Sequence, residues 1–144
     1  MEKTLITTNY IETINLGLRL SEVLNPGAVL LLTGDLGAGK TTLVRGLAKG
    51  LGIKDVVQSP TFNIMKVYLK VEKPLIHIDA YRLADVQDDI GLDEYIGYES
   101  GITVIEWPEY ISHLIPEDAI KISITHKGGD NREITISSKE EIDL

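Results

Sequence analysis

The chain has 144 residues, no cysteine and a formal net charge of −8, with 22 acidic against 14 basic side chains. The missing cysteines exclude disulfides and thiolate metal sites, and the acidic balance disfavours a direct nucleic-acid interface, which requires clustered lysine and arginine. No apolar run is as long as a membrane span and no signal-peptide pattern opens the sequence, so we expect one cytoplasmic domain over residues 1–144.

The first predicted element is a helix from Tyr10 to Leu24. Asn9 followed by Glu12 resembles a capping box, in which two side chains satisfy backbone N–H groups at the start of a helix. The apolar spacing predicts an inward face that consists of Ile11, Ile14, Leu18 and Val23 or Leu24.

A strand, a second helix and an edge strand are predicted next. Residues 28–33 form a short continuous apolar run, which is typical of a strand buried on both faces. Residues 42–51 place leucines four positions apart on one helical face. The alternating segment 62–69 then indicates a half-exposed strand, antiparallel and near the edge of a sheet.

The second half of the chain again contains predicted strands and short helices. Residues 75–79 and 102–106 predict two buried strands, and residues 84–96 predict one or two short helices between them. Residues 119–138 are typical of two alternating strands joined by a glycine-containing hairpin loop. Together these elements predict an α/β fold with a mainly parallel central sheet and antiparallel edge strands.

A complete G-x-x-x-x-G-K-[ST] phosphate-binding loop lies between the predicted strand 28–33 and helix 42–51. It consists of Gly34, Asp35, Leu36, Gly37, Ala38, Gly39, Lys40 and Thr41. The glycines allow backbone N–H groups to surround phosphate oxygens at the N-terminus of the helix. We expect Lys40 to reach the β- and γ-phosphates of a nucleoside triphosphate and the Thr41 hydroxyl to bind Mg²⁺.

Two acidic residues follow buried strands and complete such a site. Asp79 ends the segment 75–79, and Glu106 ends the segment 102–106. Both should project from the carboxyl end of a strand toward the metal ion that a phosphate-binding loop requires. Spacing alone leaves open which of the two contacts that ion.

Other candidate residues carry weaker signals. Thr61 lies in a segment suited to a loop that orders on a γ-phosphate, although a plain turn is the simpler interpretation. The histidines, His77 among them, are scattered and indicate core or surface roles rather than a metal site. Trp107 is the only tryptophan and packs in the core or forms a contact surface. Arg132 follows the hairpin glycines and either reaches the nucleotide or is a solvated cation.

Five segments, in order along the chain, resemble the bacterial TsaE (YjeE) family. They are Gly34–Thr42, Ser59–Phe62, His77–Asp85, Gly91–Tyr95 and Val104–Glu109. The H-x-D-x-Y-R and I-E-W-P patterns are much more specific than the phosphate-binding loop, and the resemblance covers nearly the whole chain. It implies a three-layer P-loop NTPase-like fold and a role as the ATPase component of the machinery that makes N6-threonylcarbamoyladenosine at position 37 of tRNAs reading codons that begin with A.

The resemblance also implies roles for individual residues. Lys40 matches the phosphate-binding lysine, Thr41 and Glu106 match the Mg²⁺ ligands, and Asp79 matches the acid required for hydrolysis. Trp107 matches an aromatic residue implicated in activity, which predicts a relay to a partner. The resemblance also places Tyr10, Thr42, Thr61 and Arg132 at the nucleotide. Of these, Thr61 lies in the switch-like segment of the family.

The cofactors implied by the resemblance are ATP and Mg²⁺, the partners are TsaD and TsaB, and tRNA is contacted only through that complex. We expect a weak ATPase that resets the complex between rounds and is not itself the threonylcarbamoyl transferase. A small P-loop kinase and a non-hydrolysing nucleotide sensor remain alternatives. The chain has only four arginines, fewer than a kinase usually needs around its phosphates, and no guanine-binding Asn-Lys-x-Asp motif of a GTPase.

Overall fold

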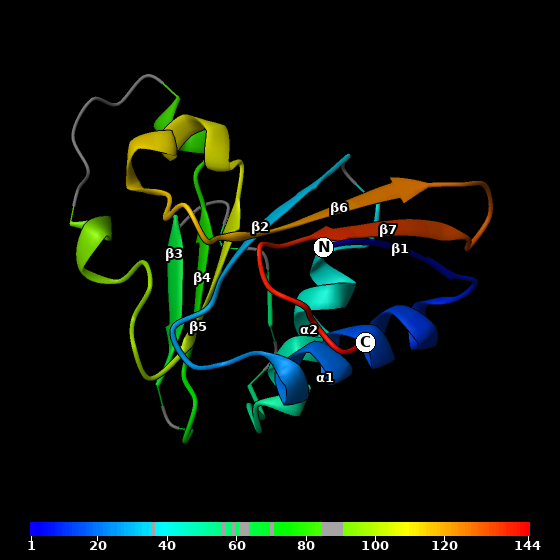
Figure 1. The fold of residues 1–144 in the computed structure, drawn as a ribbon, viewed down its shortest axis with the longest axis horizontal. Helices are drawn as coiled ribbons and strands as arrows, with labels where there is room; N and C mark the ends of the chain where they lie inside the picture. Colours follow the sequence, from blue (N-terminus) through cyan, green and yellow to red (C-terminus); the bar gives the residue numbers. More distant parts are fainter. Residues whose placement is uncertain (36, 56, 59, 61–63, 70, 85–90) are drawn as a thin grey trace.

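The computed structural model describes residues 1–35, 37–55, 57–58, 60, 64–69, 71–84 and 91–144. Within these residues, seven strands form one sheet in the order β1-β7-β6-β2-β5-β4-β3 (Figure 1). The strands are β1 (Glu2–Thr7), β2 (Val29–Gly34), β3 (Met65–Tyr68), β4 (Leu75–Asp79), β5 (Ile102–Glu106), β6 (Ile120–His126) and β7 (Arg132–Ser137).

The four central strands of the sheet are parallel. β2 lies between β6 and β5, and β5 lies beside β4, with parallel pairing throughout. At one edge β7 and β1 are added antiparallel, and at the other edge β3 runs antiparallel to β4. The predicted mainly parallel sheet with antiparallel edges is therefore confirmed, and the carboxyl ends of β2, β5 and β4 meet along one side, where open α/β sheets bind their ligands.

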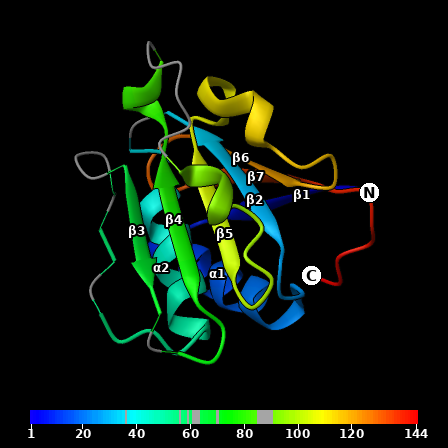
Figure 2. The same cartoon turned by 90° about the vertical axis from the view of Figure 1, so that its left-hand side faces the viewer.

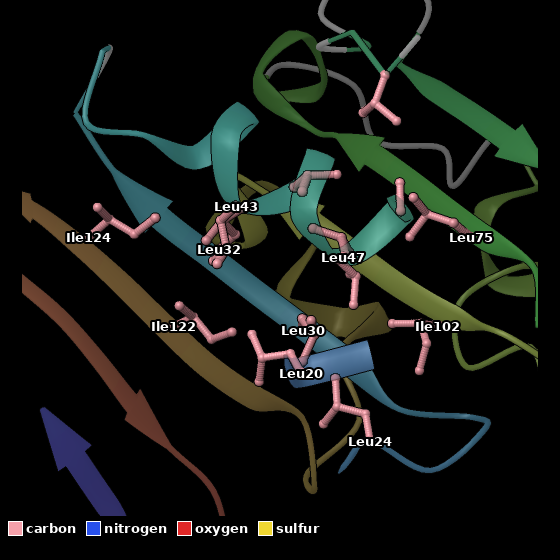
Figure 3. Packing of buried hydrophobic residues seen from close by; sticks show 14 of the residues in the cluster. Leu20, Leu24, Leu30, Leu32, Leu43, Leu47, Leu75, Ile102, Ile122 and Ile124 are labelled. Carbon is pink, nitrogen blue, oxygen red and sulfur yellow. The ribbon is translucent and has the colours of Figure 1, made fainter. Parts of the chain in front are cut away.

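Two helices cover one face of this sheet and short 3₁₀ segments cover part of the other (Figure 2). The helices are α1 (Tyr10–Val23) and α2 (Lys40–Gly50), and the 3₁₀ segments are η1 (Tyr81–Leu83), η2 (Leu92–Glu94) and η3 (Pro108–Leu114). Each face has its own hydrophobic cluster, which confirms the three-layer arrangement. Figure 3 shows the cluster on the helical side, which includes Leu20, Leu24, Leu30, Leu32, Leu43, Leu47, Leu75, Ile102, Ile122 and Ile124.

The start of α1 is capped as predicted. The Asn9 side chain accepts a hydrogen bond from the Glu12 N–H group at 2.9 Å. The Glu12 carboxylate in turn accepts from the Thr8 N–H group at 2.6 Å. The Glu12 carboxylate thus reaches Thr8, one residue before the position that a standard capping box uses, and the two bonds place Tyr10 in the first turn of α1.

The predicted inward face of α1 is partly wrong, because Leu24 is buried as predicted and Ile14 and Leu18 are half-buried, but Ile11 is not buried. Ile11 is 55% exposed, whereas the helix buries Thr13, Gly17, Leu20 and Ser21. The reason is that α1 packs on α2 through its backbone. A Cβ atom built on Gly46 of α2 would lie 2.1 Å from the Ile14 carbonyl oxygen of α1. Small residues therefore form the contact between the helices, and the larger apolar residues flank it.

Some elements differ from the sequence-based expectation. Strand β1 and segment η3 are not predicted from the sequence. Residues 85–90, where a short helix is expected, lie outside the described residues, although η2 follows directly after them. None of the helices in the described part of the chain combines the length and apolarity needed to cross a bilayer.

Candidate nucleotide-binding site

The phosphate-binding loop joins β2 to α2, in the arrangement that the sequence predicts. Strand β2 ends at Gly34, and the Ala38 N–H group donates to the Asp35 carbonyl at 3.0 Å. Gly39 precedes the first turn of α2 with φ 108° and ψ 13°, a conformation that favours glycine. The loop therefore ends at the N-terminus of an 11-residue helix, whose dipole attracts anions. Leu36 lies outside the described residues.

The first turn of α2 carries Lys40, Thr41 and Thr42. The Lys40 Nζ atom lies 3.6 Å from the Glu106 Oε1 atom and 5.5 Å from the centroid of the Trp107 ring. Both threonines are half-buried. The cation expected to meet phosphates thus lies beside the acid expected to meet a metal ion.

Asp79 and Glu106 end neighbouring parallel strands in register with each other. Both are buried, at 3% and 4% exposure. The Asp79 Oδ1 atom accepts a hydrogen bond from the Tyr81 N–H group at 3.0 Å, which holds this carboxylate at the start of η1. The structure therefore brings both predicted acids to the same edge of the sheet and places Glu106 in direct contact with Lys40.

Each oxygen of the Glu106 carboxylate has its own cationic or donor partner. Oε2 lies 2.8 Å from the His77 Nε2 atom, and Oε1 lies beside Lys40. Burial raises the pKa of the Glu106 carboxyl, but the hydrogen bond with His77 and the positive charge of Lys40 outweigh it and hold this pKa below its ordinary value of 4.5. Glu106 is therefore ionised near neutral pH.

Sequence reasoning assigned His77 a core or surface role and missed its contact with Glu106. A signal for it exists in the sequence. His77 precedes Asp79 by two positions in a strand, and residues two apart share one face of a sheet. The same face of the neighbouring strand carries Glu106.

Trp107 follows Glu106 and packs with two tyrosines. Its ring centroid lies 5.1 Å from that of Tyr81 and 6.0 Å from that of Tyr110. Its backbone has φ 57° and ψ 51°, a left-handed conformation that is unfavourable for a bulky residue. Such conformations are held by their surroundings and cluster at functional sites. The partly buried indole packs against the hydrophobic cluster on the face opposite the two helices, as the core interpretation expects, and it also borders Lys40. Its predicted role as a contact surface or relay to a partner stays a prediction.

Arg132 binds the phosphate-binding loop from the side of β7. Its Nε atom donates to the Ala38 carbonyl at 2.9 Å, and its Nη2 atom donates to the Gly37 carbonyl at 3.5 Å. Its Nη1 atom donates to two carbonyls of the β6–β7 hairpin. The guanidinium group therefore ties the hairpin to the loop.

Tyr10, Thr42 and Arg132 are brought together beside the loop. They line a small pocket together with Asn9, Thr13, Gly39 and Asp130. Tyr10 is 67% exposed at the start of α1. Thr61, the last of the residues predicted to lie near the nucleotide, is outside the described residues.

Known proteins share both the sequence and the fold. The family described as "Threonylcarbamoyl adenosine biosynthesis protein TsaE" matches residues 7–134. The chain is 44% identical over 132 residues to the tRNA threonylcarbamoyladenosine biosynthesis protein TsaE of Bacillus subtilis (strain 168), which covers 92% of this chain and 83% of that protein. It is 42% identical over 128 residues to the TsaE protein of Treponema pallidum (strain Nichols), covering 88% and 93%.

The fold is similar to the crystal structure of Bacillus subtilis YdiB, with a TM-score of 0.81 and 36% sequence identity. This similarity covers 97% of the present chain and 87% of that one. The range matched by the family model includes the phosphate-binding loop, both acids and the hairpin that supports the loop. The chain belongs to the TsaE family.

Proposed function

We propose that this chain binds ATP with Mg²⁺ and hydrolyses it slowly, as an accessory factor in the formation of threonylcarbamoyladenosine on tRNA. The observation that carries the proposal is the contact between Lys40 and Glu106, which joins a complete phosphate-binding loop to a buried, ionised acid. The family supports the pathway, since its members are threonylcarbamoyladenosine biosynthesis proteins.

The residues at the end of the loop fit Mg²⁺. The Thr41 hydroxyl and the Glu106 carboxylate are hard oxygen donors, and Mg²⁺ in nucleotide sites takes few protein ligands in addition to phosphate oxygens. Mg²⁺ would neutralise negative charge that develops on the β- and γ-phosphates. Lys40 would add a second positive charge there, and the N-terminus of α2 would supply backbone N–H groups.

Asp79 and Arg132 would act in different ways on the same reaction. The Asp79 carboxylate, held by the Tyr81 N–H group, would orient the attacking water. The Arg132 guanidinium would hold the loop in shape, because it donates to the carbonyls of Gly37 and Ala38. Because the Arg132 guanidinium group already donates to carbonyls of the loop, we assign Lys40 as the principal protein cation that binds the phosphates.

Partner proteins would supply a further positive charge to the phosphates, in addition to Lys40. An additional stabilising cation is worth about 10³–10⁵ in the rate of phosphoryl transfer. We propose that TsaD and TsaB bind the ATP-loaded domain, accelerate hydrolysis and are reset by it. The net charge of −8 fits a division of labour in which tRNA is held by these partners and the transferase activity lies with them.

Phosphate release, measured for this chain alone and with the TsaD–TsaB pair, tests the proposal. We expect slow release alone and a marked increase with the pair. Asp79→Asn should bind ATP as the wild type does but lose hydrolysis. The asparagine keeps an oxygen for the Tyr81 N–H group and loses the charge that orients water.

The alternatives give different results in the same experiment. Rapid turnover by the chain alone, with no response to the pair, would favour a small kinase or a stand-alone ATPase. Binding of ATP without phosphate release under either condition would identify a nucleotide sensor.

Trp107 fluorescence should report ATP binding. Its ring lies 5.5 Å from the Lys40 ammonium group, and it is the only tryptophan of the chain. When phosphates draw the ammonium group away from the indole, the emission of Trp107 should change. The control is Lys40→Ala, in which ATP with Mg²⁺ should leave the emission nearly constant. An unchanged spectrum for the wild type at saturating ATP would contradict the proposed link between Trp107 and the nucleotide.

A further inference from the structure

His77 is a buried polar residue for which the proposed reaction has so far given no role. It lies in the middle of β4 with 0% exposure. Its Nε2 atom is 2.8 Å from the Glu106 Oε2 atom, whereas its Nδ1 atom has no hydrogen-bond partner among the described residues. The whole polar contact of this ring is therefore directed at Glu106.

The chemistry of the pair determines which atom carries the proton. A carboxylate oxygen accepts hydrogen bonds, so at 2.8 Å the His77 Nε2 atom donates to the Glu106 Oε2 atom. In the neutral ring, Nδ1 then carries a lone pair and no proton. A buried acceptor without a partner is tolerated better than a buried N–H group without one, which favours the same tautomer.

The geometry gives this hydrogen bond a consequence for the nucleotide site. A carboxylate is planar, so fixing Oε2 by His77 limits rotation of the group and determines where Oε1 lies. That second oxygen is 3.6 Å from the Lys40 Nζ atom. Without the donor from His77, a buried negative charge would keep Lys40 as its partner and could turn both oxygens toward it.

We propose that His77 is a positioning residue, which holds Glu106 so that one carboxylate oxygen is presented to Mg²⁺ at the phosphate-binding loop. The inference rests on the proposed function. Hydrogen-bond partners of metal-binding carboxylates typically change metal affinity by about 10–100-fold when they are removed. We expect a loss of Mg²⁺ affinity in this range when the donor of His77 is removed.

Three substitutions separate positioning from space filling. His77→Gln places an amide N–H donor near the position of Nε2 and should retain Mg²⁺ affinity close to that of the wild type. His77→Asn places its donor near the position of Nδ1, too far back to reach Glu106. His77→Leu is apolar and of similar size. His77→Asn and His77→Leu should each lower the affinity for Mg²⁺ by about 10–100-fold. The measurement is the Mg²⁺ concentration that half-saturates ATP binding.

A double-mutant cycle tests whether His77 acts through Glu106. In the Glu106→Ala background, His77→Leu should cause no additional loss of Mg²⁺-dependent ATP binding. An additional loss as large as in the wild-type background would overturn the proposal. So would equal Mg²⁺ affinities for the wild type, His77→Gln and His77→Leu. Urea unfolding of each variant verifies that the folded protein is being compared.

A measurement on the unliganded wild type is independent of the variants and of activity. The ¹⁵N chemical shifts of the His77 ring should show a proton on Nε2, the atom that lies 2.8 Å from the Glu106 carboxylate. A neutral ring protonated on Nδ1 would overturn the proposal even if every variant failed to fold. Absence of any Mg²⁺-dependent ATP binding by the wild type would instead refute the proposed function, while the ring tautomer would still test the His77–Glu106 bond.

Discussion

Replacing Lys40 with alanine should lower ATP turnover by about 10²–10³-fold, the usual cost of removing one preorganised donor from a site where negative charge develops. The Lys40 ammonium group begins 3.6 Å from Glu106 and is the cation best placed to reach the β- and γ-phosphates. Phosphate release and ATP titration in the presence of Mg²⁺ measure the effect. The fold should survive, since His77 still donates to the Glu106 carboxylate.

Lys49→Ala is the matched control for this substitution. Lys49 lies in the last turn of the same helix, is exposed, and is remote from the loop in sequence. Its removal deletes the same charge from α2 and should leave turnover unchanged. Normal ATP binding and turnover by Lys40→Ala would show that the phosphate-binding loop is not the site of hydrolysis.

Gly46→Ala should destabilise the protein by about 3 kcal/mol, the upper part of the usual range for overpacking. The new Cβ atom would lie 2.1 Å from the Ile14 carbonyl oxygen and 2.8 Å from the Ile14 carbonyl carbon. Both are backbone atoms, so α1 as a whole must move away from α2. Urea unfolding measures the change, and Lys49→Ala, on the exposed face of α2, should change the free energy of unfolding by no more than about 0.5 kcal/mol.

The sign of the change in unfolding free energy of Gly46→Ala distinguishes helix propensity from steric overlap between the helices. Helix propensity alone favours alanine over glycine by about 1 kcal/mol inside a helix. The close approach of the two helices predicts a change in the opposite direction. A stabilised Gly46→Ala variant would therefore contradict the backbone contact between α1 and α2.

Local patterns were sufficient to predict the elements on which the site is built. The apolar run before Gly34 and the fixed spacing of Lys40 and Thr41 specify strand, loop and helix within about twenty residues of sequence. Apolar strands that end in Asp79 and Glu106 likewise reveal the carboxyl edge of the sheet. These features depend on neighbours in sequence, which is why sequence alone could reveal them.

Contacts between distant segments were not predictable in the same way. Strand β1 has no clear alternation of its own and forms by pairing with β7, far away in the chain. The buried face of α1 is set by the contact of Gly17 with α2. A glycine occupies this buried position, where apolar periodicity leads one to expect a large side chain. The contact of His77 with Glu106 depends on β4 lying beside β5 in one particular register. Strand order and helix approach are tertiary properties that no single segment encodes.

The order of strands in the sheet also constrains when the phosphate-binding loop can be completed during synthesis of the chain. Strand β2, which carries the phosphate-binding loop, lies between β5 and β6, and the loop is held by Arg132 at the start of β7. Because the ribosome produces β6 and β7 after β2 and β5, a nascent chain at first has only one side of β2 paired and no Arg132 to hold the loop. Long-range pairing of this kind also slows folding. We therefore expect the phosphate-binding loop to reach the geometry described above only after residues 120–137 have left the ribosome.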